Sequence, residues 1–415
     1  QGNDVGRQYR TGIYSKNSSF FYPSVGLSGI VSEMVQLPQF ISFLKVRGSF
    51  TEVGAPISAS GLSKGTVTTP IIGGVIKETM IYPFEDFKAE RTRSFETGVS
   101  MRLFNNISLE ATWYKSNTFN QTFLGDLPES SGYEKVYLQA GDVQNKGWEV
   151  SLGYNGKIDK VGFSSTLLYS KNTNLIKEMV EGFKHPLSPS LINIPEVHKD
   201  NGRVILKKGG TINDIYASQF LRKDSQGYVD IKEDGDFGLE QVSPVLLGKT
   251  TPDFTLGWNN TVSYKNFDLN FLFNGRFGGV VTSSTQAILD RFGVSKASAD
   301  ARDNGGVMIP NQGRVDAKKY YGIIATGDAP TSGYYLYSAT NVRLQELTLS
   351  YTLPASVFNN AINGMTFSLI ANNPLMIYCK APHDPELTPS TGTYGQGNDY
   401  FMQPSVKSLG IGINI

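Results

Sequence analysis

The chain has 415 residues, with 38 Lys and Arg against 37 Asp and Glu, one Cys, and aromatic side chains at 12% of positions. The near-zero net charge gives no basic excess to neutralise phosphates, so nucleic-acid binding has no electrostatic support. No run of 18 apolar residues occurs, which excludes a helical membrane span but leaves open a β-barrel, whose strands alternate in polarity.

Apolar and polar residues alternate with a period of two along much of the chain, which predicts β-strands. Two strands are expected near 5–14 and 20–32. A hairpin is predicted where Phe95–Leu103 and Ile107–Trp113 alternate on either side of the turn-forming pair at 105–106. The same alternation predicts further strands over 41–53, 148–155, 161–167, 254–264, 267–274, 341–352, 365–371 and 406–415.

The connections between these strands alternate between short and long. Short turns join the two members of each pair, whereas the long connections cover 54–91, 120–144, 172–251, 279–340 and 374–404. Outer-membrane barrels have short periplasmic turns and long extracellular loops. The pattern therefore predicts an all-β fold, an antiparallel up-and-down transmembrane β-barrel with long extracellular loops.

The polar face of the strands is compatible with two kinds of protein. Glu96, Arg102, Glu110 and Glu149 alternate with the apolar residues, which suits a watery lumen and equally suits the solvated face of a soluble sheet. The alternative interpretation is therefore a soluble, secreted, β-rich glycan-binding module or hydrolase. A soluble module would stay monodisperse without detergent.

Motifs that could support catalysis lack the structural context they require. The segment 61–65 has the form of a nucleophile elbow, but neither a buried strand before it nor a helix after it is predicted. The three histidines are scattered, without the spacing of a zinc site. We therefore expect no enzymatic activity and no organic cofactor.

One acidic segment suggests a metal ion. Asp230, Asp234 and Asp236 place oxygen ligands around Gly235 in the manner of a calcium loop, although their spacing departs from that of an EF-hand. The interpretations are a bound Ca²⁺ in an extracellular loop or a solvated acidic turn.

Aromatic residues in the long connections are the candidates for solute binding. Tyr334, Tyr335, Tyr337 and Tyr394 can stack on sugars or peptides. The other interpretations are that these rings pack within the loops or anchor the protein at the membrane interface.

Several segments together resemble the C-terminal half of the barrel of SusC/RagA-like TonB-dependent transporters. The match follows the family's order along nearly the whole chain. The segments are FYPSVGLSGIVSE (21–33), LKVRGSFTEVG (44–54), AERTRSFETGVSMRLFNN with ISLEATWYKSNT (89–118), LPESSGY with VQNKGWEVSLGY (127–154), TPDFTLGWNNTVSYKNFDLNFLFNGRFGG (251–279), NVRLQELTLSYTLP (341–354) and DPE (384–386).

The resemblance implies a 22-stranded outer-membrane barrel with a plugged lumen, in which residues 1–415 supply about twelve strands. It further implies an N-terminal plug, energy from TonB through that plug, and a SusD-like surface lipoprotein as a lid. The expected function is uptake of glycans or peptides across the outer membrane of a Gram-negative, Bacteroidota-type bacterium. The plug and the N-terminal strands are expected outside this chain, which would then be a fragment, a cleavage product or one of the two chains of a split transporter.

Overall fold

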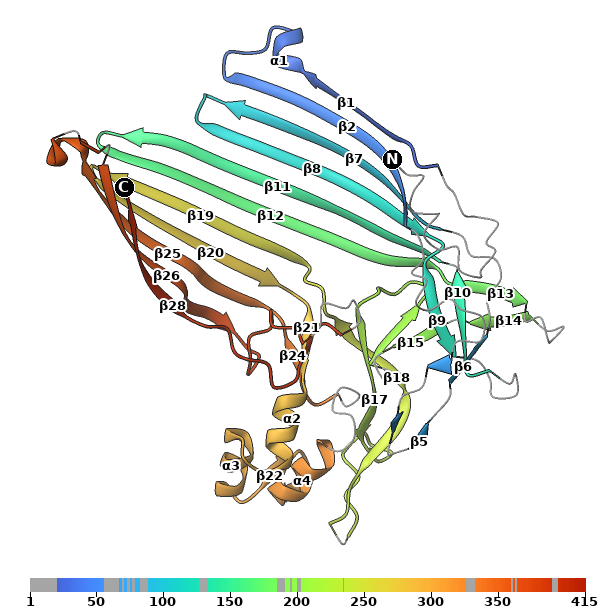
Figure 1. Ribbon diagram of the computed structural model, residues 1–415. Coiled ribbons are helices and arrows are strands. Elements are labelled where there is room, and N and C mark those ends of the chain that lie inside the picture. The colour runs from blue at the N-terminus through green and yellow to red at the C-terminus, as the bar shows by residue number, and fades with distance from the viewer. Residues whose placement is uncertain are drawn as a thin grey trace.

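The computed structural model describes residues 21–415, apart from 56–66, 69–70, 73–74, 77–78, 83–88, 127–132, 140, 185–190, 195, 200–202, 234, 326–332, 360, 363 and 390–394. Its main feature is an 11-stranded antiparallel sheet in the order β1-β2-β7-β8-β11-β12-β19-β20-β25-β26-β28. The sheet curves like part of a barrel wall, with short turns at one end and small loop elements at the other (Figure 1).

The strands of this sheet correspond to those predicted from alternation. They are β1 (Ser24–Ile30), β2 (Ile41–Ala55), β7 (Glu90–Leu103), β8 (Ile107–Phe119), β11 (Asp142–Ile158), β12 (Val161–Glu178), β19 (Phe254–Tyr264), β20 (Phe267–Phe277), β25 (Asn341–Pro354), β26 (Gly364–Cys379) and β28 (Ser408–Asn414). Eleven expected strands are thus confirmed, and the expected strand near 5–14 lies outside the described residues. Because β11 and β12 have 17 and 18 residues, more than the ten or so that cross a bilayer, they extend beyond it.

Left-handed residues close the tight turns at one end of the sheet. Asn105 between β7 and β8 has a φ of 61°, and Asp159 between β11 and β12 has a φ of 52°. Asn and Asp adopt this conformation more readily than most residues, which explains the sharp reversal at these positions. The short helix α1 (Val31–Met34) occupies the β1–β2 connection at the same end (Figure 1).

One face of the sheet is apolar from strand to strand. The register aligns an uninterrupted row of six side chains on neighbouring strands: Leu44, Met101, Leu109, Leu152, Leu167 and Trp258. Leu152 is 45% exposed, and Leu27 and Ile411 near the two edges are 81% and 77% exposed. Apolar surface of this extent is unfavourable in water, whereas it matches the outward face of a membrane barrel.

Aromatic side chains form two bands on this apolar face. One band lies near the short turns and includes Phe163, Tyr264, Phe267 and Tyr351; the rings of Phe267 and Tyr351 are 4.6 Å apart. The other lies several residues farther along the strands. It includes the pairs Trp113–Trp148 and Phe254–Phe277, whose ring centroids are 6.5 Å and 4.8 Å apart. Two such girdles flank the lipid-facing band of outer-membrane barrels.

The long connections contain their own small elements, at the end of the sheet opposite the short turns (Figure 1). Their strands are β3 (Val67–Thr68), β4 (Ile71–Ile72), β5 (Val75–Ile76), β6 (Thr79–Tyr82), β9 (Thr122–Asp126), β10 (Lys135–Gln139), β13 (Val180–Lys184), β14 (Leu191–Ile194), β15 (Glu196–Lys199), β16 (Val204–Lys207), β17 (Asp214–Leu221), β18 (Leu239–Lys249), β21 (Val280–Ser283), β22 (Val307–Ile309), β23 (Gly313–Val315), β24 (Leu336–Ser338) and β27 (Asn398–Asp399).

Three helices complete these connections: α2 (Ser284–Arg291), α3 (Lys296–Asp303) and α4 (Ala317–Ile324). Ser283, Ser295 and Asp316 cap them, each accepting a hydrogen bond from a backbone N–H of the first turn. A 3₁₀ turn (Ala355–Phe358) lies between β25 and β26. Within the part of the chain that the structure describes, no helix is long and apolar enough to cross a membrane.

The buried apolar clusters of the described residues lie in the loop region. Ile176, Leu206 and Ile215, each 0% exposed, belong to a first cluster that joins the far end of β12 to β16 and β17. Burying each of these side chains contributes about 1.5–3 kcal/mol. The long loops are therefore folded, because they have an apolar core of their own.

Candidate functional site

The concave face of the sheet is polar and forms the first part of the candidate site. Its register aligns Ser100, Glu110 and Ser151 on adjacent strands, in the rows that alternate with the lipid-facing ones. A hollow of about 530 Å³ opens in this face, and Glu110, Glu149 and Asn274 are among its lining residues. Carboxylates, amides and hydroxyls in a concave wall can hydrogen-bond a hydrated solute or a polar protein segment.

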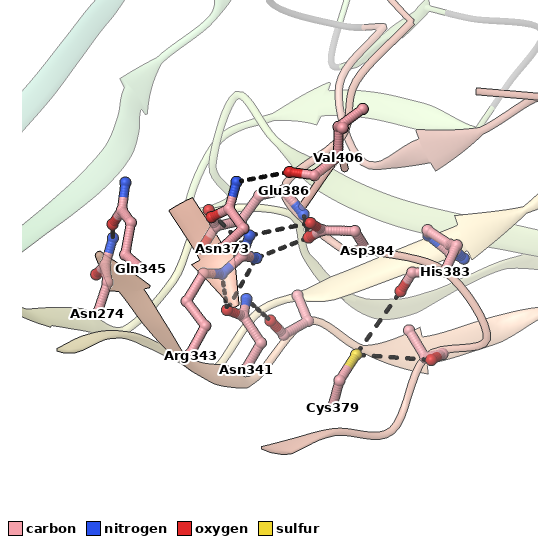
Figure 2. A network of polar contacts seen from close by, with 12 residues as sticks. Asn274, Asn341, Arg343, Gln345, Asn373, Cys379, His383, Asp384, Glu386 and Val406 are labelled. Atoms are coloured by element: carbon pink, nitrogen blue, oxygen red, sulfur yellow. Dashed lines mark hydrogen bonds and ion pairs between the residues drawn. The ribbon is translucent and has the colours of Figure 1, made fainter. Parts of the chain in front are cut away.

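An arginine at the loop end of this polar face binds the loop that follows β26 (Figure 2). Arg343 of β25 donates two hydrogen bonds to the carboxylate of Asp384, at 3.0 and 2.7 Å, and lies 3.4 Å from Glu386. Its guanidinium also donates to the Oδ1 atom of Asn341. The Arg343 and Asp384 side chains are only 7% and 6% exposed, so this is a buried, bidentate ion pair.

The electrostatics of this contact keep Asp384 ionised. Burial by itself raises the pKa of the Asp384 carboxyl, but hydrogen bonds from Arg343, from the Glu386 backbone and from Ser405 outweigh burial and lower the pKa below its usual value. The neighbouring His383 behaves differently, because burial lowers its pKa despite the nearby carboxylates of Asp399 and Asp384. The loop is therefore held by a charged Asp384 beside a neutral His383 at neutral pH.

The segment 395–401 connects three long loops. β27 pairs in parallel with β21, and the Ser283 hydroxyl donates to the Asp399 carboxylate at 2.7 Å. From the loop between β12 and β19, the fully buried Arg203 donates to the Gln396 carbonyl oxygen at 3.1 Å, across 193 residues of sequence. These contacts join the three loops into one structure at the loop end of the sheet, which we call the rim.

The predicted aromatic site is located mainly in the packed interior of this rim. Tyr335 is 3% exposed and belongs to the second buried cluster, with α2 and α4 residues around it. The Tyr334 hydroxyl accepts a hydrogen bond from the Leu221 backbone N–H at 2.8 Å, and Tyr337 packs edge-to-face against His383. Burial raises the pKa of Tyr337 to about 12, so its hydroxyl is protonated at neutral pH.

Solute contact by these residues stays a prediction. Tyr334 and Tyr337 retain part of their surface, whereas Tyr335 contributes mainly to packing. Tyr394 lies outside the described residues.

The proposed calcium ligands of the 230–236 loop are paired with cations where they are described. The Asp230 carboxylate accepts a hydrogen bond from Arg222 at 2.7 Å, and that of Asp236 lies 3.7 Å from Lys232. Asp234 lies outside the described residues. Among the side chains that the structure does describe, no group of three or more His, Cys, Asp or Glu forms a metal-binding arrangement. Calcium binding here stays a prediction.

Sequence reasoning missed the Arg343–Asp384 pair, since the partners lie 41 residues apart and neither belongs to a motif that requires the other. The only sequence signal was the DPE segment (384–386) within the family resemblance. The Tyr400–Phe401 pair was likewise not identified, because two aromatic residues in a loop look the same in sequence whether they are buried or exposed.

The comparisons with known proteins agree with this architecture. The family model for the TonB dependent receptor-like β-barrel matches residues 2–197. TonB-dependent receptor P3 of Formosa agariphila is 24% identical over 435 residues, covering 97% of this chain and 42% of the receptor. Receptor P26 of the same organism is 26% identical over 442 residues, covering 99% of this chain and 44% of that protein.

A solved structure extends the similarity to the three-dimensional fold. The RagAB peptide importer in its "open-open" state superposes with a TM-score of 0.70 at 18% identity, covering 97% of this chain and 43% of that chain. Its "closed-closed" state gives a TM-score of 0.68 with similar coverage. The chain thus spans less than half the length of the relatives it matches.

A curved antiparallel sheet with an apolar outer face, a polar inner face, short turns at one end and folded loops at the other defines part of an outer-membrane β-barrel. The chain is similar to TonB-dependent receptors along nearly its whole length, and its fold is RagA-like. The resemblance found in the sequence is confirmed. The family comprises receptors and transporters of the Gram-negative outer membrane rather than a class of enzymes.

Proposed function

We propose that this chain forms the solute-facing wall and the extracellular loop rim of a TonB-dependent importer for oligopeptides. The observation that carries the proposal is the polar concave face, with its hollow of about 530 Å³, beneath a rim of folded loops. The fold similarity to the RagAB peptide importer favours peptides as the solute class. Glycan uptake is the second candidate, because hydroxyl-rich solutes also suit a polar lumen.

The proposed mechanism is a change of affinity during the transport cycle. Polar groups of the wall and rim hold the solute, and movement of a plug driven by TonB then weakens that grip. A SusD-like surface lipoprotein covers the rim as a lid in this scheme. The existence of "open-open" and "closed-closed" states of RagAB supports a cover that opens and closes.

Growth on defined nutrients tests the proposal. A strain that lacks the full-length gene should fail to grow on oligopeptides as sole nitrogen source, yet grow normally on free amino acids. Complementation with the full-length gene should restore growth on oligopeptides. Normal growth of the deletion strain on oligopeptides would contradict peptide import, and a defect restricted to glycans would favour the second candidate.

The alternative of a soluble glycan-binding module or hydrolase conflicts with the outer face of the sheet. Strands at both edges and in the centre expose large apolar side chains, including Leu27, Leu152 and Leu409. Purified full-length protein should therefore require detergent to remain monodisperse. Monodisperse behaviour in plain buffer would favour the soluble alternative.

A further inference from the structure

Two aromatic side chains are exposed at the rim, in contrast to the tyrosines packed inside it. Tyr400 is 57% exposed and Phe401 is 55% exposed. Their ring centroids are 5.5 Å apart and the planes meet at 83°, an edge-to-face pair. The two rings form a corner rather than a single flat platform.

The backbone beneath these rings is fixed by hydrogen bonds on both sides. β27, which immediately precedes Tyr400, pairs with β21, and the Thr282 backbone N–H donates to the Gly397 carbonyl oxygen at 2.8 Å. The Phe401 backbone N–H donates to the hydroxyl of Thr285 at 2.6 Å. Phe401 has a φ of 47°, which is uncommon for a bulky residue and requires such support.

The contacts of the loop place this pair near the loop end of the sheet's inner face. Arg343, which binds Asp384, belongs to the inner face of the sheet, since the register pairs it with the hollow-lining Asn274. His383, next to Asp384, lies 3.8 Å from Asp399, the residue before Tyr400. The aromatic pair is thus carried by a loop that is anchored to the inner wall at the loop end of the sheet.

The side-chain oxygens of the two residues before the pair already accept hydrogen bonds. The side-chain oxygen of Asn398 accepts hydrogen bonds from the hydroxyls of Thr282 and Ser284, and Asp399 accepts one from Ser283. A sugar would need such groups to recognise its hydroxyls, whereas an apolar side chain needs only contact with the rings.

We propose that Tyr400 and Phe401 form a binding site for an apolar side chain of an incoming oligopeptide. This inference rests on the proposed import of peptides and assigns one contact within it. A rigid aromatic pair loses little conformational entropy when it binds, so the site contributes to peptide selection at the mouth.

The test uses purified full-length protein and two oligopeptides of equal length, one with a central Phe and one with Ser at that position. The double variant Tyr400→Ala/Phe401→Gly removes both rings, and glycine adopts the positive φ without strain. Calorimetric titration should show about 10-fold or greater loss of affinity for the Phe peptide and no change for the Ser peptide. The control Phe292→Ala removes another exposed ring, 73% exposed, and should leave both affinities unchanged.

Two results would overturn this inference while the proposed function stands. One is unchanged affinity of the double variant for the Phe peptide, and the other is an equal loss for both peptides. Retained peptide affinity with loss of a co-purifying lipoprotein would likewise overturn it, since the rings would then serve partner docking. If the unaltered protein bound neither peptide, the proposed peptide import itself would fail. A heat-modifiable band in electrophoresis establishes that each variant is folded.

Discussion

At the scale of single residues, the Arg343–Asp384 pair is a contact on which the order of the rim depends. Both side chains are almost fully buried, and Asn341 and Glu386 provide further polar contacts to the guanidinium. Removing one partner of a buried ion pair leaves the other charge without compensation, whereas exposed pairs contribute little. Substituting Arg343 should therefore cost much more stability than substituting an exposed arginine on the same face of the sheet.

The first prediction follows from that asymmetry. Arg343→Met should destabilise the rim by about 3–5 kcal/mol, because the buried carboxylate of Asp384 loses its partner. Denaturant unfolding followed by a probe on the loop 380–389 would measure the loss. Arg47→Met is the control, since Arg47 is exposed and its guanidinium donates to the Thr112 hydroxyl at 2.7 Å, and the loss of this bond should cost less than about 1 kcal/mol. Similar costs for the two variants would contradict the assignment.

The second prediction concerns pH. Because the folded-state pKa of Asp384 lies below that of the unfolded chain, its contribution to stability is present above about pH 4 and is lost as the pH falls through the lowered pKa. His383, whose pKa is also lowered, destabilises the rim in the same direction below about pH 6.5. Hydrogen exchange of 380–389, corrected for intrinsic rates, should therefore accelerate on acidification.

Two variants separate these contributions. His383→Phe should abolish the part of the acceleration that begins near neutral pH, and Asp384→Asn should abolish the part at lower pH. Protection that stays constant from pH 7 to pH 3 in the unaltered protein would contradict both assignments.

The third prediction compares neighbouring residues on β11. Leu152 faces outward and is 45% exposed, whereas Ser151 lines the inner hollow. Leu152→Arg should lower the free energy of unfolding in a lipid bilayer by about 2–4 kcal/mol, because lipid cannot solvate the charge. Ser151→Arg should lower it far less. Unfolding of the complete barrel in lipid measures the difference. Equal costs would remove the distinction between the two faces.

At the scale of elements, the strands of the barrel wall could be predicted and the loop elements could not. Alternation in Phe95–Leu103 or Phe254–Tyr264 is a local property of the sequence. Every strand of the wall shows it, because each strand has one face toward lipid and the other toward the lumen. By contrast, β27 has two residues and exists because β21, more than a hundred residues earlier, pairs with it. Whether a tyrosine is buried, like Tyr335, or exposed, like Tyr400, depends on such long-range contacts.

The fourth prediction tests which ends of the strands face outside. In a background where Cys379 is replaced by Ser, single cysteines at Gln226 and Asp303 should react with an impermeant reagent on intact cells. Cysteines at Asn106 and Lys160, in the short turns, should react only after the outer membrane is permeabilised. All four positions are exposed, so accessibility of the side chain is matched. Reaction of the turn cysteines on intact cells would invert the topology.

At the scale of the whole molecule, the sheet has two edges that require partners. Within the described part of the chain, β1 pairs with β2 alone and β28 with β26 alone. In a membrane, each backbone group left without a hydrogen bond costs several kcal/mol, so an open edge in lipid is strongly unfavourable. The outward side chains at both edges, such as Leu27 and Ile411, are nonetheless apolar and suited to lipid.

The last prediction is that about ten further strands close the barrel by continuing the sheet beyond β1 and pairing with β28, as in a 22-stranded transporter. Residues 1–415 expressed alone should then give no heat-modifiable, protease-resistant barrel, because both edges stay open. Co-expression with the remaining barrel and plug should restore both properties. Proline at Gly410, in the centre of β28, should impair this assembly, since it removes a backbone N–H from the ladder. Proline in the exposed hairpin at Gln226 should not. A closed, heat-modifiable barrel formed by residues 1–415 alone would show that the two edges pair with each other, and would refute the requirement for additional strands.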